Sequence, residues 1–144
     1  MRKIFTILFI AFSFVSFAQT YNGNLVLTSQ AQVDTFRYKK ISGNLTIKGL
    51  SINNIDSLYK LDTISNGWIT IDSTNLTNLY GLRNIKTNTS QNTLTVTNNP
   101  ILNNVSSLNV YVFSVNRISI INNATLNNID SLFYINNIVW LNIY

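Results

Sequence analysis

The chain has 144 residues, enough for one domain, and its 10 Lys and Arg against 5 Asp give it a formal charge of +5. It contains no His, Cys or Glu, which excludes disulfide scaffolds, cysteine-ligated zinc, Ser-His-Asp triads, Cys nucleophiles and His-based acid–base chemistry. Hydrophobic residues make up 46% of the chain, so it is too apolar for intrinsic disorder, and 24 Asn residues replace much of the usual charge.

Residues 1–18 have the pattern of a secretory signal peptide. Arg2 and Lys3 precede an apolar run from Ile4 to about Phe17, and Ser16-Phe17-Ala18 has the small-x-small form of a cleavage site. The alternative is a transmembrane anchor, but this run of about 14 residues is shorter than the roughly 20 that span a bilayer. We therefore expect cleavage after Ala18 and a secreted or cell-surface location.

The mature chain is only mildly basic. Without Arg2 and Lys3 it carries 8 positive and 5 negative residues, a net charge of +3. Arg37, Lys39 and Lys40 form its one cluster of cations, which is a poor footprint for nucleic acid. We expect no nucleic acid among its partners and no membrane span in the mature chain.

Short strands are predicted at regular intervals. Six triplets with apolar first and third residues recur at spacings of 20 to 25 residues, and the first of them is wholly apolar. Alternation of this kind, rich in β-branched residues, is typical of a strand with one buried face. The triplets are Leu25-Val26-Leu27, Leu45-Thr46-Ile47, Ile69-Thr70-Ile71, Leu94-Thr95-Val96, Ile118-Ser119-Ile120 and Leu141-Asn142-Ile143.

Between these strands, apolar residues recur at every third position, which suits a tight 3₁₀-like or short helical return or an extended coil. They are Ile52, Ile55, Leu58, Leu61 and Ile64, then Leu76, Leu79, Leu82 and Ile85, then Leu126, Ile129, Leu132, Ile135 and Ile138. The hexapeptide NNIDSL occurs at residues 53–58 and again at 127–132, about three repeats later. A unit this small cannot close a core, so the pattern predicts a mainly β repeat solenoid with a parallel sheet and short returns.

Three segments resemble a leucine-rich repeat, and more narrowly the receptor L-domain-like repeats of secreted bacterial surface proteins. They are residues 44–47, 76–82 and 94–100, and the resemblance extends over nearly all of residues 20–144. It implies a right-handed superhelix in which Asn99 and Asn123 hydrogen-bond buried backbone in the turn after the strand. Leu50 and Thr74 depart from this pattern at the equivalent places, and the polar segment from Thr87 to Thr93 is expected to bulge.

No catalytic or metal site is expected. Asp56 and Asp130 occupy the same repeat position three turns apart, so at about 5 Å per turn they would lie about 15 Å from each other, too far to cooperate as a glycosidase pair. Asp72 with Asn75 supplies fewer oxygen ligands than calcium requires. We expect no enzyme activity, cofactor or metal.

The outward face of the sheet is the expected binding surface. Thr46, Thr70, Thr95 and Ser119 would form a column of hydroxyls, and Trp, Tyr and Arg are enriched in binding hot spots. The alternative is that the tryptophans cover the core edge or pack against a loop or the next domain. The candidate ligand-binding residues are Lys48, Trp68, Asp72, Arg117, Trp140 and Tyr144.

Together these patterns predict a signal peptide at residues 1–18 and a leucine-rich-repeat solenoid of about five turns at residues 19–144. The chain stops inside the last predicted strand without a capping repeat, so we expect a longer protein with further repeats or an anchoring domain. The predicted function is a non-catalytic binding or adhesion module for a protein or carbohydrate ligand at a bacterial cell surface. The alternatives are a structural spacer or accessory region of a longer extracellular enzyme and, third, a polysaccharide lyase or hydrolase.

Overall fold

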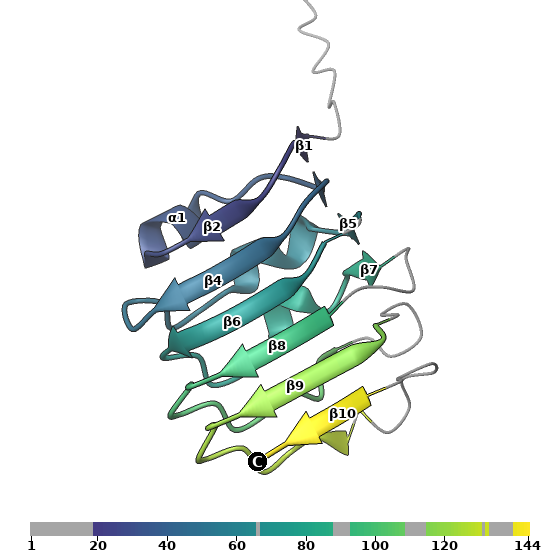
Figure 1. The fold of residues 1–144 in the computed structure, drawn as a ribbon. Helices are drawn as coiled ribbons and strands as arrows, with labels where there is room; N and C mark the ends of the chain where they lie inside the picture. Colours follow the sequence, from purple (N-terminus) through teal and green to yellow (C-terminus); the bar gives the residue numbers. More distant parts are fainter. Residues whose placement is uncertain (1–18, 66, 88–92, 109–114, 131, 133–139) are drawn as a thin grey trace, which may run out of the picture.

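The computed structural model describes residues 19–65, 67–87, 93–108, 115–130, 132 and 140–144 (Figure 1). The predicted signal peptide at 1–18, most of the predicted bulge between Thr87 and Thr93, and the last predicted apolar positions, Ile135 and Ile138, lie outside the described residues. Within the described part of the chain, no helix is long and apolar enough to cross a membrane.

A six-stranded parallel sheet dominates the structure, as predicted. Its order is β10-β9-β8-β6-β4-β2, so neighbours in space are successive strands of this sheet along the chain. The six predicted triplets all lie in these strands and pair in register, for example Leu45 with Ile69 and Leu94 with Ile118. The strands are β2 (Leu25–Leu27), β4 (Leu45–Gly49), β6 (Ile69–Thr74), β8 (Thr93–Thr97), β9 (Arg117–Ile121) and β10 (Trp140–Ile143).

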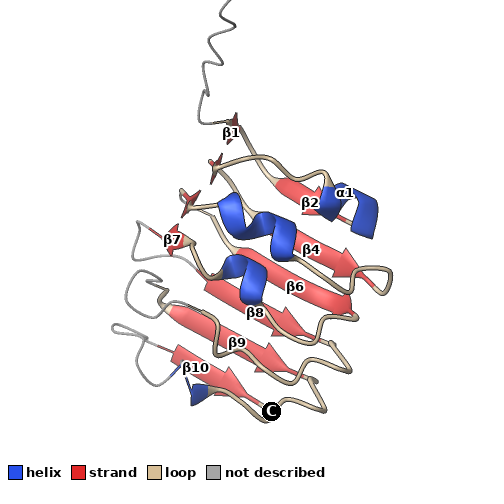
Figure 2. Cartoon of the chain, turned by 180° about the vertical axis from the view of Figure 1, so that it is seen from behind, coloured by secondary structure: helices blue, strands red, loops and turns tan. Residues whose placement is uncertain are grey.

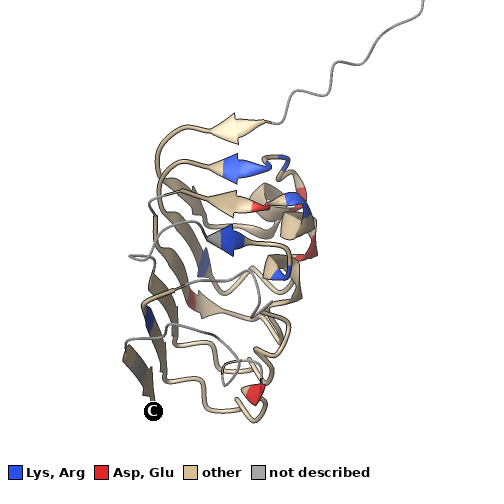
Figure 3. Ribbon diagram, turned by 90° about the vertical axis from the view of Figure 1, so that its right-hand side faces the viewer, with Lys and Arg blue, Asp and Glu red and all other residues tan. Residues whose placement is uncertain are grey.

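A second, four-stranded parallel sheet was missed by the sequence analysis. Its strands have two residues each, too few to show an alternating pattern: β1 (Thr20–Tyr21), β3 (Lys40–Ile41), β5 (Thr63–Ile64) and β7 (Lys86–Thr87). Each precedes a strand of the larger sheet along the chain, so the chain turns a corner between the two sheets (Figure 3).

Short helices form several of the returns and lie on the face of the six-stranded sheet that is turned toward the viewer in Figure 2. Those with described bounds are α1 (Gln30–Asp34) and two 3₁₀ helices, η1 (Asp56–Lys60) and η2 (Tyr80–Leu82). The period of three is confirmed in these two 3₁₀ returns, where every predicted apolar position from Ile52 to Ile64 and from Leu76 to Ile85 is buried. The core therefore lies between the inner face of the large sheet and the returns.

An asparagine starts four of the returns at the same repeat position, whereas Ser29 caps the first return, α1. The side-chain oxygens of Asn54, Asn78, Asn104 and Asn128 accept hydrogen bonds from the backbone N–H two residues later, at 2.6, 2.9, 2.7 and 3.3 Å. Asn104 also pairs through its backbone with Asn78 on one side and Asn128 on the other. The two copies of the duplicated hexapeptide therefore begin with the same turn, which uses part of the Asn excess.

The helices η1 and η2 pack so closely that glycine is required between them. Gly81 is buried, and a Cβ at this position would collide with the carbonyl oxygen of Ile55 one turn earlier. Backbone approaches of this kind leave no room for a side chain.

We predict that Gly81→Ala lowers the free energy of unfolding by about 2 kcal/mol, because the overpacked turn must move away from Ile55. The matched control is Ser57→Ala, in the preceding 3₁₀ helix, where the backbone already carries a Cβ. Urea unfolding of both variants measures the effect, and equal midpoints would contradict the close packing of η1 on η2.

Candidate functional site

Four side chains form a row across the large sheet where its strands begin, which we call the tryptophan row: Trp68, Thr93, Arg117 and Trp140. Arg117 is paired in register with Thr93 on one side and Trp140 on the other. Pairing of Ile69 with Leu94 brings Trp68, the residue before Ile69, alongside Thr93. Since neighbouring strands lie about 4.8 Å apart, the row extends about 14 Å from Trp68 to Trp140.

A shallow groove of about 320 Å³ follows this row. It is lined by the row itself and by Thr95 and Ser119, one alternation further along their strands. Trp68 is 59% exposed and Trp140 is 44% exposed, so both rings present apolar surface to solvent. The structure therefore brings together three of the six predicted ligand-binding residues, Trp68, Arg117 and Trp140.

Arg117 lies against the second tryptophan of the row. Its guanidinium carbon is 4.7 Å from the centroid of the Trp140 ring, within the range of a cation–π contact. Both residues belong to paired strands, β9 and β10, whose backbone hydrogen bonds fix their separation. The sheet register thus places Arg117 beside Trp140, and the cation–π contact brings its guanidinium to the ring.

In the first two turns, the same repeat position holds asparagine, and asparagine there has a structural role. The side-chain oxygen of Asn24 accepts a hydrogen bond from the Asn44 N–H at 2.9 Å, and that of Asn44 accepts one from the Trp68 N–H at 2.8 Å. The Trp68 side chain has no oxygen with which to continue this ladder. Sequence reasoning missed the ladder, although the change from Gly43-Asn44-Leu45 to Gly67-Trp68-Ile69 was its signal.

Three other predicted residues, Lys48, Asp72 and Tyr144, do not line the groove. Lys48 and Asp72 are neighbours in the register of β4 and β6. Asp72 lies four residues after Trp68 on its strand, so this pair is about 13 Å from the tryptophan row. Tyr144, 73% exposed, lines a different hollow at the β10 edge together with Ile120 and Leu126.

Asp72 is engaged in hydrogen bonds to the next turn. One of its carboxylate oxygens accepts bonds from the Thr97 hydroxyl and the Asn98 amide, both at 2.9 Å. The hydrogen bond from Asn98 is the main reason why the pKa of Asp72 lies below its usual value; burial opposes the shift, and Thr97, Ser73 and the charge of Lys48 add to it. The carboxylate therefore stays ionised and bound at the far end of the strands.

Asn99 lies buried in the turn after β8. Its side-chain oxygen accepts hydrogen bonds from the Thr74 N–H at 3.0 Å and from the Thr74 hydroxyl at 2.6 Å, one turn earlier. Its side-chain amide donates to the Thr97 carbonyl at 2.8 Å. The residue before it, Asn98, has a φ of 57°, so the turn directs the Asn99 side chain under the end of the sheet.

Asn123 occupies the equivalent turn after β9. Its oxygen accepts a bond from the Asn99 N–H at 3.1 Å, and its amide donates to the carbonyls of Val96 and Ile121, both at 3.0 Å. The residue before it, Asn122, has a φ of 56°, close to that of its counterpart one turn earlier. Thr74, Asn99 and Asn123 thus form a continuous ladder that satisfies backbone groups at the strand ends.

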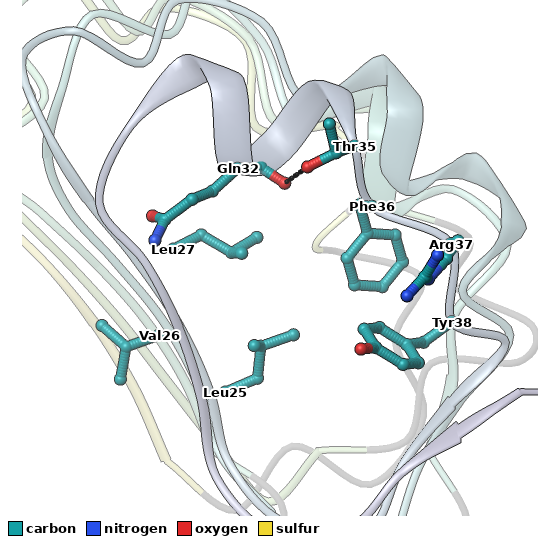
Figure 4. A pocket seen from close by; sticks show the side chains of 8 residues that line it. All are labelled: Leu25, Val26, Leu27, Gln32, Thr35, Phe36, Arg37 and Tyr38. Atoms are coloured by element: carbon teal, nitrogen blue, oxygen red, sulfur yellow. Dashed lines mark hydrogen bonds between the residues drawn. The ribbon is translucent and has the colours of Figure 1, made fainter.

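The cavity beside α1 lies at one end of the core, and its lining includes Gln32, Thr35 and Arg37 as well as apolar side chains. It measures about 330 Å³, and Figure 4 shows Leu25, Leu27, Phe36 and Tyr38 directed into it while Val26 points away. The rings of Phe36 and Tyr38 meet edge to face, with centroids 5.7 Å apart.

The acidic side chains of the described residues are dispersed, and no group of three that could hold a metal ion gathers there. Asp56 and Asp130 lie in turns that begin at Asn54 and Asn128. These turns are three spacings apart, about 14 Å, because η1 packs on η2 and the turns at Asn78, Asn104 and Asn128 pair in succession. The groove instead offers stacking surfaces, hydroxyls and one fixed positive charge.

Replacement of Asn99 by Ala should lower the free energy of unfolding by about 2–4 kcal/mol, since it leaves the buried Thr74 N–H and hydroxyl without their acceptor. Asn103→Ala is the control, because Asn103 is exposed and its side chain makes no hydrogen bond with the described residues. Denaturant unfolding compares the two, and equal losses would contradict the buried ladder.

Asp72 should contribute stability that depends on pH. Because the pKa of Asp72 is lower in the folded state than in the unfolded chain, its contribution is full above about pH 4 and is lost as pH falls through the folded value. Wild type and Asp72→Asn should therefore differ in unfolding midpoint at pH 7 and converge in acid. NMR titration of the Asp72 carboxyl gives the pKa directly, and a midpoint difference that is the same at pH 7 and in acid would refute the linkage.

Comparison with protein-family models, with curated proteins and with solved structures found no match to this chain. The assignment of its function therefore depends on the geometry of the tryptophan row and its groove.

Proposed function

We propose that the chain is a secreted, non-catalytic binding module of the leucine-rich, receptor L-domain-like type, and that its ligand lies in the groove along the tryptophan row. One observation carries the proposal. Asn24 and Asn44 accept hydrogen bonds from the next turn, but from Trp68 onward the same repeat position holds side chains that line the groove. Large aromatic rings on an open sheet face are costly unless something covers them.

The arrangement of the strands supports the repeat classification. Strand order follows chain order in both sheets, and equivalent residues of successive turns pair in register. Parallel strands joined through a crossover favour a right-handed connection, which agrees with a right-handed superhelix. Stacked turns that share one core are the arrangement expected of a solenoid.

A binding role accounts for the exposed side chains better than a structural spacer does. A structural spacer needs only turns that bond stably to one another. Asparagine at this repeat position already provides such bonds, as Asn24 and Asn44 show. A spacer role gives no reason for two exposed tryptophans and an arginine in a single row. Trp and Arg are the side chains that most often dominate binding energy.

The groove is suited to binding and not to hydrolysis. Its described lining residues include no carboxylate, whereas glycosidases need two carboxylates on either side of the scissile bond. The predicted signal peptide at residues 1–18 and the absence of Cys agree with a secreted protein that depends on its own core for stability.

Screening of the protein on glycan and protein arrays should identify a ligand whose affinity falls about 30-fold in Trp68→Ala and in Arg117→Ala, the loss expected for hot-spot side chains. Tyr59→Ala is the matched control, because Tyr59 is an exposed aromatic residue, 44% accessible, on η1 behind the sheet. Binding that survives both groove substitutions would exclude this face as the ligand site.

A further inference from the structure

Charge is distributed sparsely and unevenly over the large sheet. Its strands carry three charged residues, Lys48, Asp72 and Arg117, while most other charges lie on the four-stranded sheet and the returns (Figure 3). Asp72 and Lys48 are paired at the far end of the strands. The groove is therefore left with Arg117 as the one charged residue among its described lining residues.

No acidic residue of the chain neutralises Arg117 within the described structure. The acids other than Asp72 are Asp34, Asp56, Asp62 and Asp130, and all of them belong to the helices and returns behind the sheet or to the segment leading to β5. By sequence, segments 88–92, 109–114 and 133–139, which precede β8, β9 and β10, contain no acidic residue. An uncompensated guanidinium in a groove favours an anionic ligand.

The contact with Trp140 prepares Arg117 for such a ligand. The ring holds the guanidinium, at 4.7 Å, but supplies no oxygen to its N–H donors. A guanidinium presents these donors as a planar fork that matches the two oxygens of a carboxylate or sulfate group. Because β9 and β10 are paired, the backbone of both residues is already ordered before a ligand binds, and the cation–π contact favours one orientation of the Arg117 side chain.

The remaining lining residues suit sugar rings. Trp68 and Trp140 expose aromatic surface near the two ends of the row, where the apolar face of a pyranose can stack. Thr93, Thr95 and Ser119 lie between them, and each hydroxyl can both donate and accept a hydrogen bond, as sugar hydroxyls require. The row crosses the strands over about 14 Å, which is room for several consecutive sugar units of an extended chain.

A peptide is a poorer fit to the same surface. A peptide that adds a strand to a sheet needs an unpaired edge, whereas most of the groove lies on the face of β8 and β9, each paired on both sides, and only Trp140 comes from the edge strand β10. An extended peptide in an aromatic-lined groove would not require a cation such as Arg117.

We propose that the groove binds an acidic polysaccharide, with a carboxylate or sulfate group of one sugar on Arg117 and sugar rings stacked on Trp68 and Trp140. This inference rests on the proposed binding function and adds the chemical class of its ligand.

The test compares each acidic polymer with a neutral form that has the same backbone. Polygalacturonate is paired with its fully methyl-esterified form, and sulfated carrageenan with its desulfated form. Titration calorimetry with the protein should show binding of polygalacturonate, carrageenan or both at least about tenfold tighter than binding of the matching neutral form, weakening with salt. Which of the two is bound identifies the anionic group.

Variants assign the effect to single side chains. Arg117→Gln should abolish the preference for the acidic polymer and Arg117→Lys should restore part of it, while Trp68→Ala should weaken binding of charged and neutral forms alike. Lys86→Gln, which removes an equal charge from β7 outside the groove, should bind like wild type. Unfolding midpoints of all variants establish that each is folded.

Four results would overturn the inference. Equal affinity for acidic and neutral polymers would refute the role of ligand charge, and an acidic preference that survives Arg117→Gln would refute the role of Arg117; the proposed binding function stands in both cases. Protein ligands that depend on Trp68, with no polysaccharide bound, would refute the ligand class alone. Absence of any ligand that depends on Trp68 or Arg117 on either array would refute both proposals.

Discussion

The structure depends on stacking equivalent turns in register, so that each polar group meets its counterpart about 4.8 Å away on the next turn. Asparagine meets this constraint well, because its side chain carries both a donor and an acceptor and can bond to an identical neighbour. Asn122 donates to Asn98 at 3.1 Å, and Asn98 in turn donates to Asp72 at 2.9 Å. The scarcity of charge has the same origin, since identical charges stacked at this spacing would repel each other.

This constraint also shows where function can be located. Positions that must satisfy the next turn keep the same residue type, as Asn24 and Asn44 do in their ladder. The ladder stops at Trp68, so in the following turns this repeat position need not hold asparagine. It holds Thr93, Arg117 and Trp140 instead. The backbone pairing that restricts the rest of the sheet then holds these side chains at fixed spacing, which is the preorganisation that a binding site needs.

The periodicity of apolar residues allowed the strands and returns to be predicted from the sequence. Features that depend on contacts between particular residues of different turns could not be predicted in this way. Strand triplets and returns with a period of three are visible because burial repeats with the local backbone period, so Leu45, Ile69 and Leu58 could be assigned to the core. The strands of the smaller sheet have two residues each, too few to show a periodic pattern of apolar residues, so they could not be predicted. The predicted triplets do align Trp68 with Arg117 and Trp140 and place Asp72 at another repeat position, as the register confirms. The sequence does not reveal that the asparagine ladder ends at Trp68, because that depends on hydrogen bonds between turns.

The separation of Asp72 from the groove is what leaves Arg117 able to attract an anion. Asp72 lies two strands and four residues away from Arg117, a diagonal of about 16 Å, which is twice the Debye length at physiological salt. Its hydrogen bonds to Thr97 and Asn98 hold its carboxylate at the far end of the strands, and the nearby charge of Lys48 offsets it further. At physiological salt the positive potential at the groove is then that of Arg117, because the charge of Asp72 is screened over this distance. The proposed selectivity for an acidic ligand therefore depends on Arg117 and requires only that Asp72 lie beyond the reach of its charge.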